Sequence, residues 1–363
     1  MITLNIRLPG RSYPIQIGDG ILERALPELF CGRPAKKAAV VSDETVWSLH
    51  GARLEAALRG HGVDFAATIL PAGEASKSLN AFERLLRAFA RQGLHRNDPV
   101  IAFGGGVVGD LAGFAASAFM RGVPFAQIPT TLLAQVDSSV GGKVAVNLPE
   151  GKNLVGSFYQ PALVIADTGL LASLPRRELN AGLAEVVKYA AIGCDGLLPL
   201  LETKAGETPG PDRLARIVEL CCVCKAGYVE RDERDTGDRM MLNFGHTFGH
   251  AVEKYFQFER YNHGEAVAIG MALAARAGLL LGLTPRETLT QITDLLDAAG
   301  ISDAAPCSPT ELIPLMLGDK KSGEGELTLI LLRAFGAPFA HKIRPERLLA
   351  LFADADMRER VKV

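Results

Sequence analysis

The sequence PVIAFGGGVVGD, residues 99–110, indicates the fold class, because in it a predicted buried strand leads directly into a glycine-rich turn. Residues 99–103 are apolar and have the length of a strand that is buried on both faces. Gly104, Gly106 and Gly109 fit the pattern G-x-G-x-x-G, in which the backbone can approach a pyrophosphate and helix amides stabilise its charge. The acidic residue usual about 20 positions later is missing. The pattern alone therefore leaves open both a dinucleotide loop and an ordinary tight turn.

The segments around this stretch predict an α/β half followed by a helical half. Residues 37–43 and 65–70 read as strands and residues 79–92 as a helix, which favours a Rossmann-like parallel sheet covered on both faces. Asp43 ends one of these strands and could supply the missing acid from a different topological order. Further helices are expected at residues 178–192, 213–232, 244–256, 264–282 and 285–299. A Gly/Pro-rich connection is expected at residues 203–211, and a loop with a short extended run at residues 320–332.

This pattern predicts two domains. We expect an α/β domain over residues 1–170 and a mostly α-helical domain over residues 171–363. Domain junctions are favoured places for ligand pockets, so the active site is expected in a cleft between the two.

Composition excludes several classes of protein. The 363 residues carry 39 basic and 41 acidic side chains, so the chain lacks the basic excess of a nucleic-acid-binding protein. The opening residues have no signal-peptide pattern, and the six cysteines show no disulfide framework. We therefore expect a cytoplasmic protein with reduced thiols and no membrane partner. The apolar window at residues 266–283 contains Arg276 and is predicted to be a buried helix.

Two charges interrupt an otherwise apolar helix at residues 179–193. Glu185 and Lys188 fall on one helical stripe among Ala, Val, Leu and Tyr. A surface ion pair would contribute about 0.2–0.5 kcal/mol, but charges inside an apolar stripe are rarely buried unless paired or bound to metal. The stripe therefore favours a functional site. Lys225 lies on a similar stripe, where a snorkelling lysine is an equally good explanation.

Three of the seven histidines, His246, His250 and His263, fall within eighteen residues. His246 and His250 are four apart, hence on one helical face, and Glu253 follows one turn later. Thr247 stands where a zinc peptidase has its glutamate, so peptidase chemistry is not supported. Two or three histidines with one carboxylate make a catalytic zinc shell with an open position. The alternative is a set of capping and core histidines.

Short motifs appear in order along nearly the whole chain. They are PAGEASK (71–77), GGGVVGD (104–110), RGV (121–123), QIPTTLLA (127–134), DSSVGGK (137–143), GKN (151–153), LPRRE (174–178), LNFGHT (242–247) and DKK (319–321). Together they resemble the 3-dehydroquinate synthases, one family of the sugar-phosphate cyclases.

The resemblance implies a reaction and two cofactors. It implies conversion of 3-deoxy-D-arabino-heptulosonate 7-phosphate to 3-dehydroquinate and phosphate by transient oxidation, phosphate elimination, re-reduction and aldol closure. NAD is the implied oxidant, and a divalent metal, zinc or cobalt, is the implied Lewis acid. Asp43 at a strand end favours NAD over NADP, since it would repel a ribose phosphate.

The resemblance also implies residue roles. The implied metal ligands are Glu185, His246 and His263. The implied NAD contacts are Asp43, Glu74, Lys77, Gly105, Gly106, Val107, Asp110, Thr130, Thr131, Lys143, Lys152 and Ser173. The implied substrate groups are Arg121, Lys143, Lys152, Asn153, Lys188, Lys225, Arg239, Asn243, His250 and Lys320, with Asp137 holding the site together. His250 is the implied proton-transfer group, and Arg121 is implied to reach the phosphate site of the partner in a homodimer.

The chain departs from the family pattern at a few positions. Ser173 replaces a commoner Thr, Thr45 replaces Asn, and Asp235 replaces Glu. Lys320 and its neighbour Lys321 both fit the substrate lysine, and the motif position favours Lys320.

Three alternatives stay in view. A metal-dependent polyol dehydrogenase of the same architecture would not need Lys143, Asn153 and Lys225 together with Arg239 and Lys320. A cyclase acting on sedoheptulose phosphate would have no substrate carboxylate to bind. A dinucleotide-sensing protein would retain the glycine loop but could lose its reactive side chains.

Overall fold

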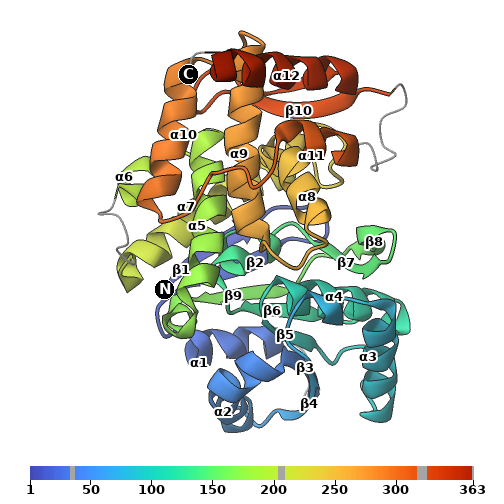
Figure 1. Cartoon of the computed structure of the whole chain (residues 1–363). Helices are drawn as coiled ribbons and strands as arrows, with labels where there is room; N and C mark the ends of the chain where they lie inside the picture. Colours follow the sequence, from blue (N-terminus) through green and yellow to red (C-terminus); the bar gives the residue numbers. More distant parts are fainter. Residues whose placement is uncertain (33–36, 203–208, 317–324, 362–363) are drawn as a thin grey trace. The chain divides into compact units, whose positions relative to one another are not determined.

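The computed structural model describes residues 1–32, 37–202, 209–316 and 325–361 and forms two compact units (Figure 1). The first unit is Met1–Leu179 with Gly210–Arg234, and the second is Asn180–Pro209 with Asp235–Val363. The sequence predicted one boundary between residues 170 and 171. The two units instead alternate along the sequence, because helix α7 (Pro211–Arg231) packs on strands of the first unit.

The first unit contains nine strands and, besides α7, four helices within its described residues. The strands are β1 (Ile2–Ile6), β2 (Tyr13–Gly18), β3 (Lys37–Asp43), β4 (Asp64–Leu70), β5 (Val100–Gly104), β6 (Phe125–Pro129), β7 (Lys143–Leu148), β8 (Gly151–Phe158) and β9 (Leu163–Asp167). The helices are α1 (Leu22–Ala25), α2 (Glu44–Gly60), α3 (Leu79–Arg91) and α4 (Gly106–Ala118). Short turns of helix are η1 (Leu26–Phe30), η2 (Glu74–Ser76), η3 (Phe119–Arg121), η4 (Ala134–Ser138) and η5 (Thr168–Ser173).

Seven of these strands form one sheet in the order β1-β2-β9-β6-β5-β3-β4. The pairing is parallel from β2 to β4, and only β1 joins antiparallel, so the predicted Rossmann-like sheet is confirmed. The remaining two strands, β7 and β8, form a separate antiparallel hairpin. The chain runs from β3 outward to β4 and then returns to β5 on the other side of β3. This reversal is a topological switch point, and the carboxyl ends of β3 and β5 meet there.

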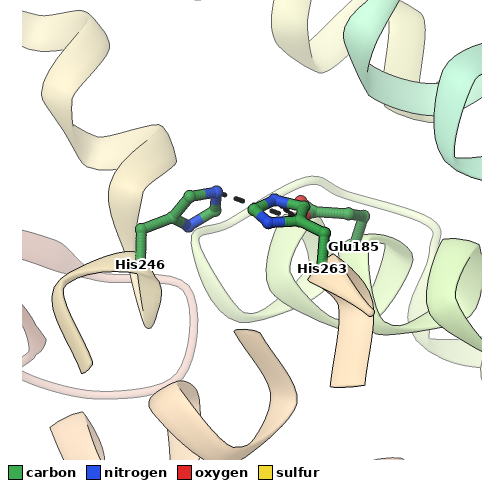
Figure 2. A group of neighbouring side chains, drawn as sticks. All are labelled: Glu185, His246 and His263. Atoms are coloured by element: carbon green, nitrogen blue, oxygen red, sulfur yellow. Dashed lines mark ion pairs between the residues drawn. The ribbon is translucent and has the colours of Figure 1, made fainter. Parts of the chain in front are cut away.

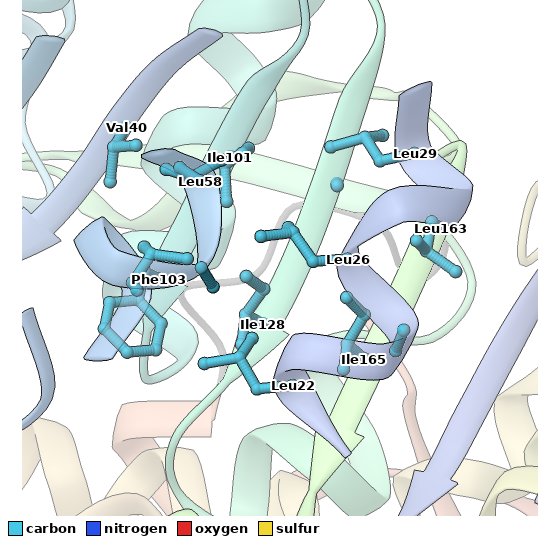
Figure 3. Close-up of a cluster of buried hydrophobic side chains, with 14 of the residues drawn as sticks. Leu22, Leu26, Leu29, Val40, Leu58, Ile101, Phe103, Ile128, Leu163 and Ile165 are labelled. Carbon is cyan, nitrogen blue, oxygen red and sulfur yellow. The ribbon is translucent and has the colours of Figure 1, made fainter. Parts of the chain in front are cut away.

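Alternating residues of the central strands serve two cores. Val40, Ile101 and Phe103 point toward α1, η1 and α2, as Figure 3 shows. Their neighbours Val41 and Ala102 face α3 and α4 on the opposite side. Because both faces are covered, the strands are apolar throughout, which is why residues 99–103 read as a continuous apolar run.

The second unit is mostly helical in its described part. Its elements are α5 (Arg176–Ala191, whose first turn belongs to the first unit), α6 (Leu198–Leu201), η6 (Asp238–Asn243), α8 (His246–Tyr255), α9 (His263–Leu280), α10 (Arg286–Ala298), α11 (Pro309–Met316), β10 (Leu327–Leu332), β11 (Pro338–Ile343) and α12 (Pro345–Val361). The five helices predicted after residue 170 are confirmed as α5, α7, α8, α9 and α10. Residues 203–208 of the predicted connection and residues 320–324 of the predicted loop lie outside the described residues.

Close backbone contact holds α8 against α9. A Cβ on Gly270 would lie 2.0 Å from the carbonyl oxygen of Gly245, so only glycine allows this approach. The predicted buried helix at residues 266–283 overlaps α9, and in the described residues no helix has the length and apolarity needed to cross a membrane. All six cysteines lie in the described part of the chain, and none of them forms a disulfide there.

Candidate active site

Helix α5 carries two buried charges. The side chain of Glu185 is fully buried and that of Lys188 is 1% exposed, and Lys188 Nζ lies 2.5 Å from Glu185 Oε2. The Lys188 ammonium also lies 4.5 Å from the centre of the Tyr189 ring. Burying two charges costs several kcal/mol per ion unless partners compensate it. A structural role alone would be served as well by apolar residues, so the arrangement indicates a functional site.

His246 begins α8, after Gly245 in a left-handed conformation with φ of 82°. The His246 Nδ1 lies 3.2 Å from the carbonyl oxygen of Phe244, which can only accept a hydrogen bond. Nδ1 is therefore the protonated nitrogen, and the lone pair is on Nε2, which lies 3.8 Å from Glu185 Oε1. Burial lowers the pKa of His246 to about 3, so the imidazole is neutral, as a metal ligand must be.

His263 begins α9, where Asn262 and Glu265 form a reciprocal capping box. A Cβ on the next residue, Gly264, would lie 2.2 Å from the carbonyl oxygen of Ala181, so the glycine lets α9 start directly against α5. This contact brings His263 Nε2 to 3.5 Å from Glu185 Oε1.

The other nitrogen of His263 faces a second carboxylate. His263 Nδ1 lies 3.6 Å from Oε1 of Glu253, which is 2% exposed. Burial alone would lower the pKa of His263, but hydrogen bonding and charge from Glu185 and Glu253 outweigh it and raise the pKa to about 10. The imidazole is thus held between two buried carboxylates.

Glu185, His246 and His263 converge, as Figure 2 shows. Each offers one ligand atom, and these atoms lie within 4.8 Å of one another. One carboxylate and two imidazoles, with a neutral His246 whose Nε2 lone pair faces the group, fit a divalent ion with open positions for other ligands.

His250 lies beside this group without joining it. Its ring centroid is 5.6 Å from that of His246 and 6.2 Å from that of His263, and its side chain is exposed. His250 instead belongs to a second possible ligand group with Glu253 and His263. The structure therefore places His246 and His250 in different possible ligand groups, a distinction that their spacing in the sequence could not make.

Two more predicted site residues lie on η6, in the second unit. Arg239 is 2% exposed and Asn243, the last residue of η6, is exposed. Lys320 and Lys321, the predicted substrate lysines, lie outside the described residues.

In the first unit, Asp43 and the glycine loop occupy the switch point at the ends of β3 and β5. Asp43 Oδ1 accepts the backbone N–H groups of Thr45 and Val46, and in the described residues its second oxygen accepts no hydrogen bond. Helix α4 begins after Gly105 without a side-chain cap, so its first amides are available to an anion.

The glycines of this loop stand where even a Cβ would crowd a neighbouring side chain. A Cβ on Gly105 would lie 3.1 Å from Thr131 Cγ2, and one on Gly106 would lie 3.0 Å from Ser138 Oγ. Thr130 is 4% exposed, and its buried hydroxyl has no hydrogen-bond partner in the part of the chain described. A glycine backbone without side chains, uncapped helix amides and, in the described residues, a hydroxyl without a partner fit the diphosphate of a dinucleotide.

The loop before α3 meets α4 and the β7–β8 hairpin. Lys77 Nζ lies 2.5 Å from Oδ2 of Asp110, which follows the glycine loop on α4; Val107 lies in the first turn of that helix. Burial raises the pKa of Asp110, while the Lys77 charge opposes that rise. Glu74 Oε1 accepts a hydrogen bond from Asn147 Nδ2 at 2.7 Å.

The hairpin carries three other predicted residues, Lys143, Lys152 and Asn153. Lys143 begins β7 and is exposed, and Asn153 on β8 is exposed and has φ of 57°.

Lys225 on α7 lies against η4. Its Nζ lies 2.8 Å from the carbonyl oxygen and 2.9 Å from Oδ1 of Asp137. A lysine that is 6% exposed and held by two oxygens of one residue does not snorkel to solvent.

The remaining predicted residues of this unit, Arg121 and Ser173, are exposed. Arg121 has φ of 68° and ends η3. Ser173 Oγ lies 2.7 Å from His50 Nε2.

His50 and Asn147 were not predicted from the sequence. Both contact predicted site residues that are distant in the chain, Ser173 and Glu74, and no local pattern indicates such pairs. Glu253 was noted for its helical spacing, but the spacing gave no indication of its contact with His263.

Known proteins are similar to this chain in sequence and in fold. The family model for the N-terminal part of 3-dehydroquinate synthase matches residues 67–181, and the C-terminal model matches residues 182–322. A 3-dehydroquinate synthase from Desulforamulus reducens is 46% identical over 340 residues, covering 93% of this chain and 95% of the relative.

Solved structures of related enzymes are also similar to this chain. A 2-deoxy-scyllo-inosose synthase complexed with carbaglucose-6-phosphate, NAD+ and Co2+ matches with a TM-score of 0.87 and 27% identity, covering 97% of this chain and 99% of that one. A 2-epi-5-epi-valiolone synthase from Streptomyces hygroscopicus, with NAD+ and Zn2+ bound, matches with a TM-score of 0.84 and 27% identity over 99% of both chains. The fold is that of the sugar-phosphate cyclases. Within that class, the chain belongs to the 3-dehydroquinate synthase family.

Proposed function

We propose that this chain converts 3-deoxy-D-arabino-heptulosonate 7-phosphate to 3-dehydroquinate and phosphate, a step of aromatic amino-acid biosynthesis. The observation that carries the proposal is identity of 46% to a 3-dehydroquinate synthase over 93% of the chain. The buried Glu185–Lys188 pair supports it, because an ion pair inside an apolar helix serves a site better than it serves stability.

NAD is the proposed dinucleotide. When bound, NAD would supply a reversible acceptor for the hydride on the ring carbon that bears the hydroxyl, so that no net oxidation occurs. The second carboxylate oxygen of Asp43, which accepts no hydrogen bond in the described residues, suits a ribose diol, and the α4 amides with Gly105, Gly106 and Val107 suit the diphosphate. The other proposed contacts are Glu74, Lys77, Asp110, Thr130, Thr131, Lys143, Lys152 and Ser173.

Zinc or cobalt is the proposed metal, held by Glu185, His246 and His263. Such an ion polarises substrate oxygens as a Lewis acid. The convergent donors and the fixed tautomer of His246 support this ligand set.

His250 is the proposed proton carrier. It lies next to the ligand group on the same face of α8, and its side chain is exposed. An imidazole near the reacting hydroxyl can accept its proton as hydride leaves.

Cationic and amide side chains are proposed to bind the two anionic ends of the substrate. They are Lys143, Lys152, Asn153, Lys188, Lys225, Arg239, Asn243 and Lys320. Asp137 is proposed to orient Lys225 through the two oxygens that contact its ammonium.

We further propose a cytoplasmic homodimer in which Arg121 of one protomer completes the phosphate site of the other. Arg121 has a left-handed backbone, and its side chain is exposed. An exposed arginine can contact a partner protomer.

Genetic complementation tests the function. A bacterium lacking its own 3-dehydroquinate synthase is expected to grow without aromatic amino acids when it expresses this chain. The Lys188→Ala variant serves as the matched negative control. Failure to grow, with the wild-type protein present and folded, would refute the proposed function.

A further inference from the structure

Asn147 lies on β7 at the point where the hairpin meets the loop before α3. Its backbone N–H donates to the carbonyl oxygen of Lys77 at 2.9 Å, and a parallel bridge pairs it with Ser78. Its side-chain Nδ2 donates to Glu74 Oε1 at 2.7 Å. Asn147 is thus joined to the segment proposed to bind NAD through both its backbone and its side chain.

The same side chain holds an irregularity in the hairpin. Val146 pairs with Val155 and Leu148 pairs with Gly151, so residues 152–154 of β8 all face Asn147 alone. Such a bulge leaves backbone groups of the longer strand without ladder partners. Asn147 Oδ1 accepts the backbone N–H of Asn153 at 2.9 Å and so supplies one partner.

The bulge sets the direction of two proposed substrate groups, Lys152 and Asn153. Asn153 has φ of 57°, a conformation that costs a non-glycine residue energy unless its surroundings hold it. The hydrogen bond from its N–H to Asn147 is one such restraint.

We propose that Asn147 is a positioning residue that couples dinucleotide binding to substrate binding. A ligand that fixes Glu74 also fixes the Asn147 amide, and the amide in turn fixes the bulge that carries Lys152 and Asn153. Both ligands therefore favour one arrangement of the amide, and each raises the affinity for the other by the same factor. This inference rests on the proposed function, because it takes Glu74 as an NAD contact and the bulge as a substrate contact.

Two substitutions separate the two hydrogen bonds of the amide. Asn147→Asp keeps an oxygen to accept the Asn153 N–H but cannot donate to Glu74, and it sets two carboxylates side by side. Asn147→Ala removes both bonds. Leu154→Ala is the matched control, because Leu154 lies on the same bulge with a side chain that is 56% exposed.

The coupling is measured by calorimetry on metal-loaded protein freed of NAD. The affinity for the heptulosonate phosphate is compared with and without saturating NADH, which cannot accept a hydride and so prevents turnover. In the wild type, NADH is expected to raise substrate affinity at least about fivefold, within the usual range of coupling between sites. Leu154→Ala should keep that ratio, whereas Asn147→Asp and Asn147→Ala should bring it close to one. If Asn147→Ala does not fold, Asn147→Asp alone decides the question.

The outcomes are distinct. A wild type that binds neither NADH nor the heptulosonate phosphate refutes the proposed function. A wild type that binds both, with no coupling or with coupling unchanged in Asn147→Asp, overturns the role of Asn147 and leaves the function intact. Loss of coupling in Leu154→Ala as well would also overturn it, because the effect would then belong to the whole hairpin.

Discussion

His246 and His250 lie one turn apart on α8, yet we predict that their replacement by alanine has different consequences. His246→Ala removes one of three donors that lie within 4.8 Å of one another, so the metal should be lost and activity with it. Glu185→Ala should behave in the same way. His250→Ala leaves that group of donors complete, so the protein should retain its metal and bind NAD.

The expected effect of His250→Ala is on turnover. General acid–base groups contribute about 10²–10⁴-fold, which is about 2.7–5.4 kcal/mol of activation free energy at about 1.36 kcal/mol per tenfold. His250 is exposed, and its ring centroid lies 5.6 Å from that of His246. Replacing His250 with alanine should therefore cost little stability.

The assay compares metal content by elemental analysis after dialysis, NAD binding, and steady-state phosphate release. Thr247→Ala, between the two histidines in the same helix, is the matched control and should leave metal content unchanged. A metal-free His250→Ala protein would refute the separation of roles, as would a fully loaded His246→Ala protein.

Three further predictions follow from the same geometry. NADP should activate NAD-free protein at least about tenfold less well than NAD because Asp43 repels a ribose phosphate, and Asp43→Asn should narrow that gap; equal activation by both cofactors would contradict this. Mixing inactive Arg121→Ala with inactive Lys188→Ala should restore up to about a quarter of wild-type activity, because half of random dimers are mixed and each has one intact site; verified mixed dimers without activity would exclude a shared site. His263, with a pKa raised to about 10, carries a proton in the metal-free protein below that pH, so zinc binding should release about one proton and weaken about tenfold per unit as pH falls from 9 to 7. Calorimetry in buffers of different ionisation enthalpy measures that proton, and zinc binding without proton release would count against it.

The fold could be predicted wherever the signal is local. Residues 37–43 form β3 with the predicted bounds, and residues 79–92 differ from α3 by one residue, because hydrophobic period and flanking polar residues mark such elements. The hairpin of β1 and β2 was not predicted, since its place depends on β9, far along the chain. The grouping of α7 with the sheet is likewise a long-range result that helical periodicity does not indicate.

Residues of the candidate site could be predicted where the side chain is unusual for its position in the sequence. Glu185 and Lys188 stood out because charges in an apolar stripe need partners, and both are buried in the structure. The contacts of Asn147 with Glu74 and of His50 with Ser173 could not be predicted, since each joins residues from different elements through one hydrogen bond. Polar residues on a strand or a helix are ordinary, and their role becomes visible only when the partners are placed.

In the proposed reaction oxidation is transient, so the chain releases phosphate without consuming NAD. The most direct measurement follows phosphate and NADH together, with the heptulosonate phosphate in large excess over NAD on metal-loaded protein. The account predicts many phosphates released per NAD, no accumulation of NADH, and a product whose mass is that of the substrate less phosphoric acid. Phosphate release that stops at one equivalent per NAD, or NADH that accumulates with turnover, would contradict it and indicate a net dehydrogenase.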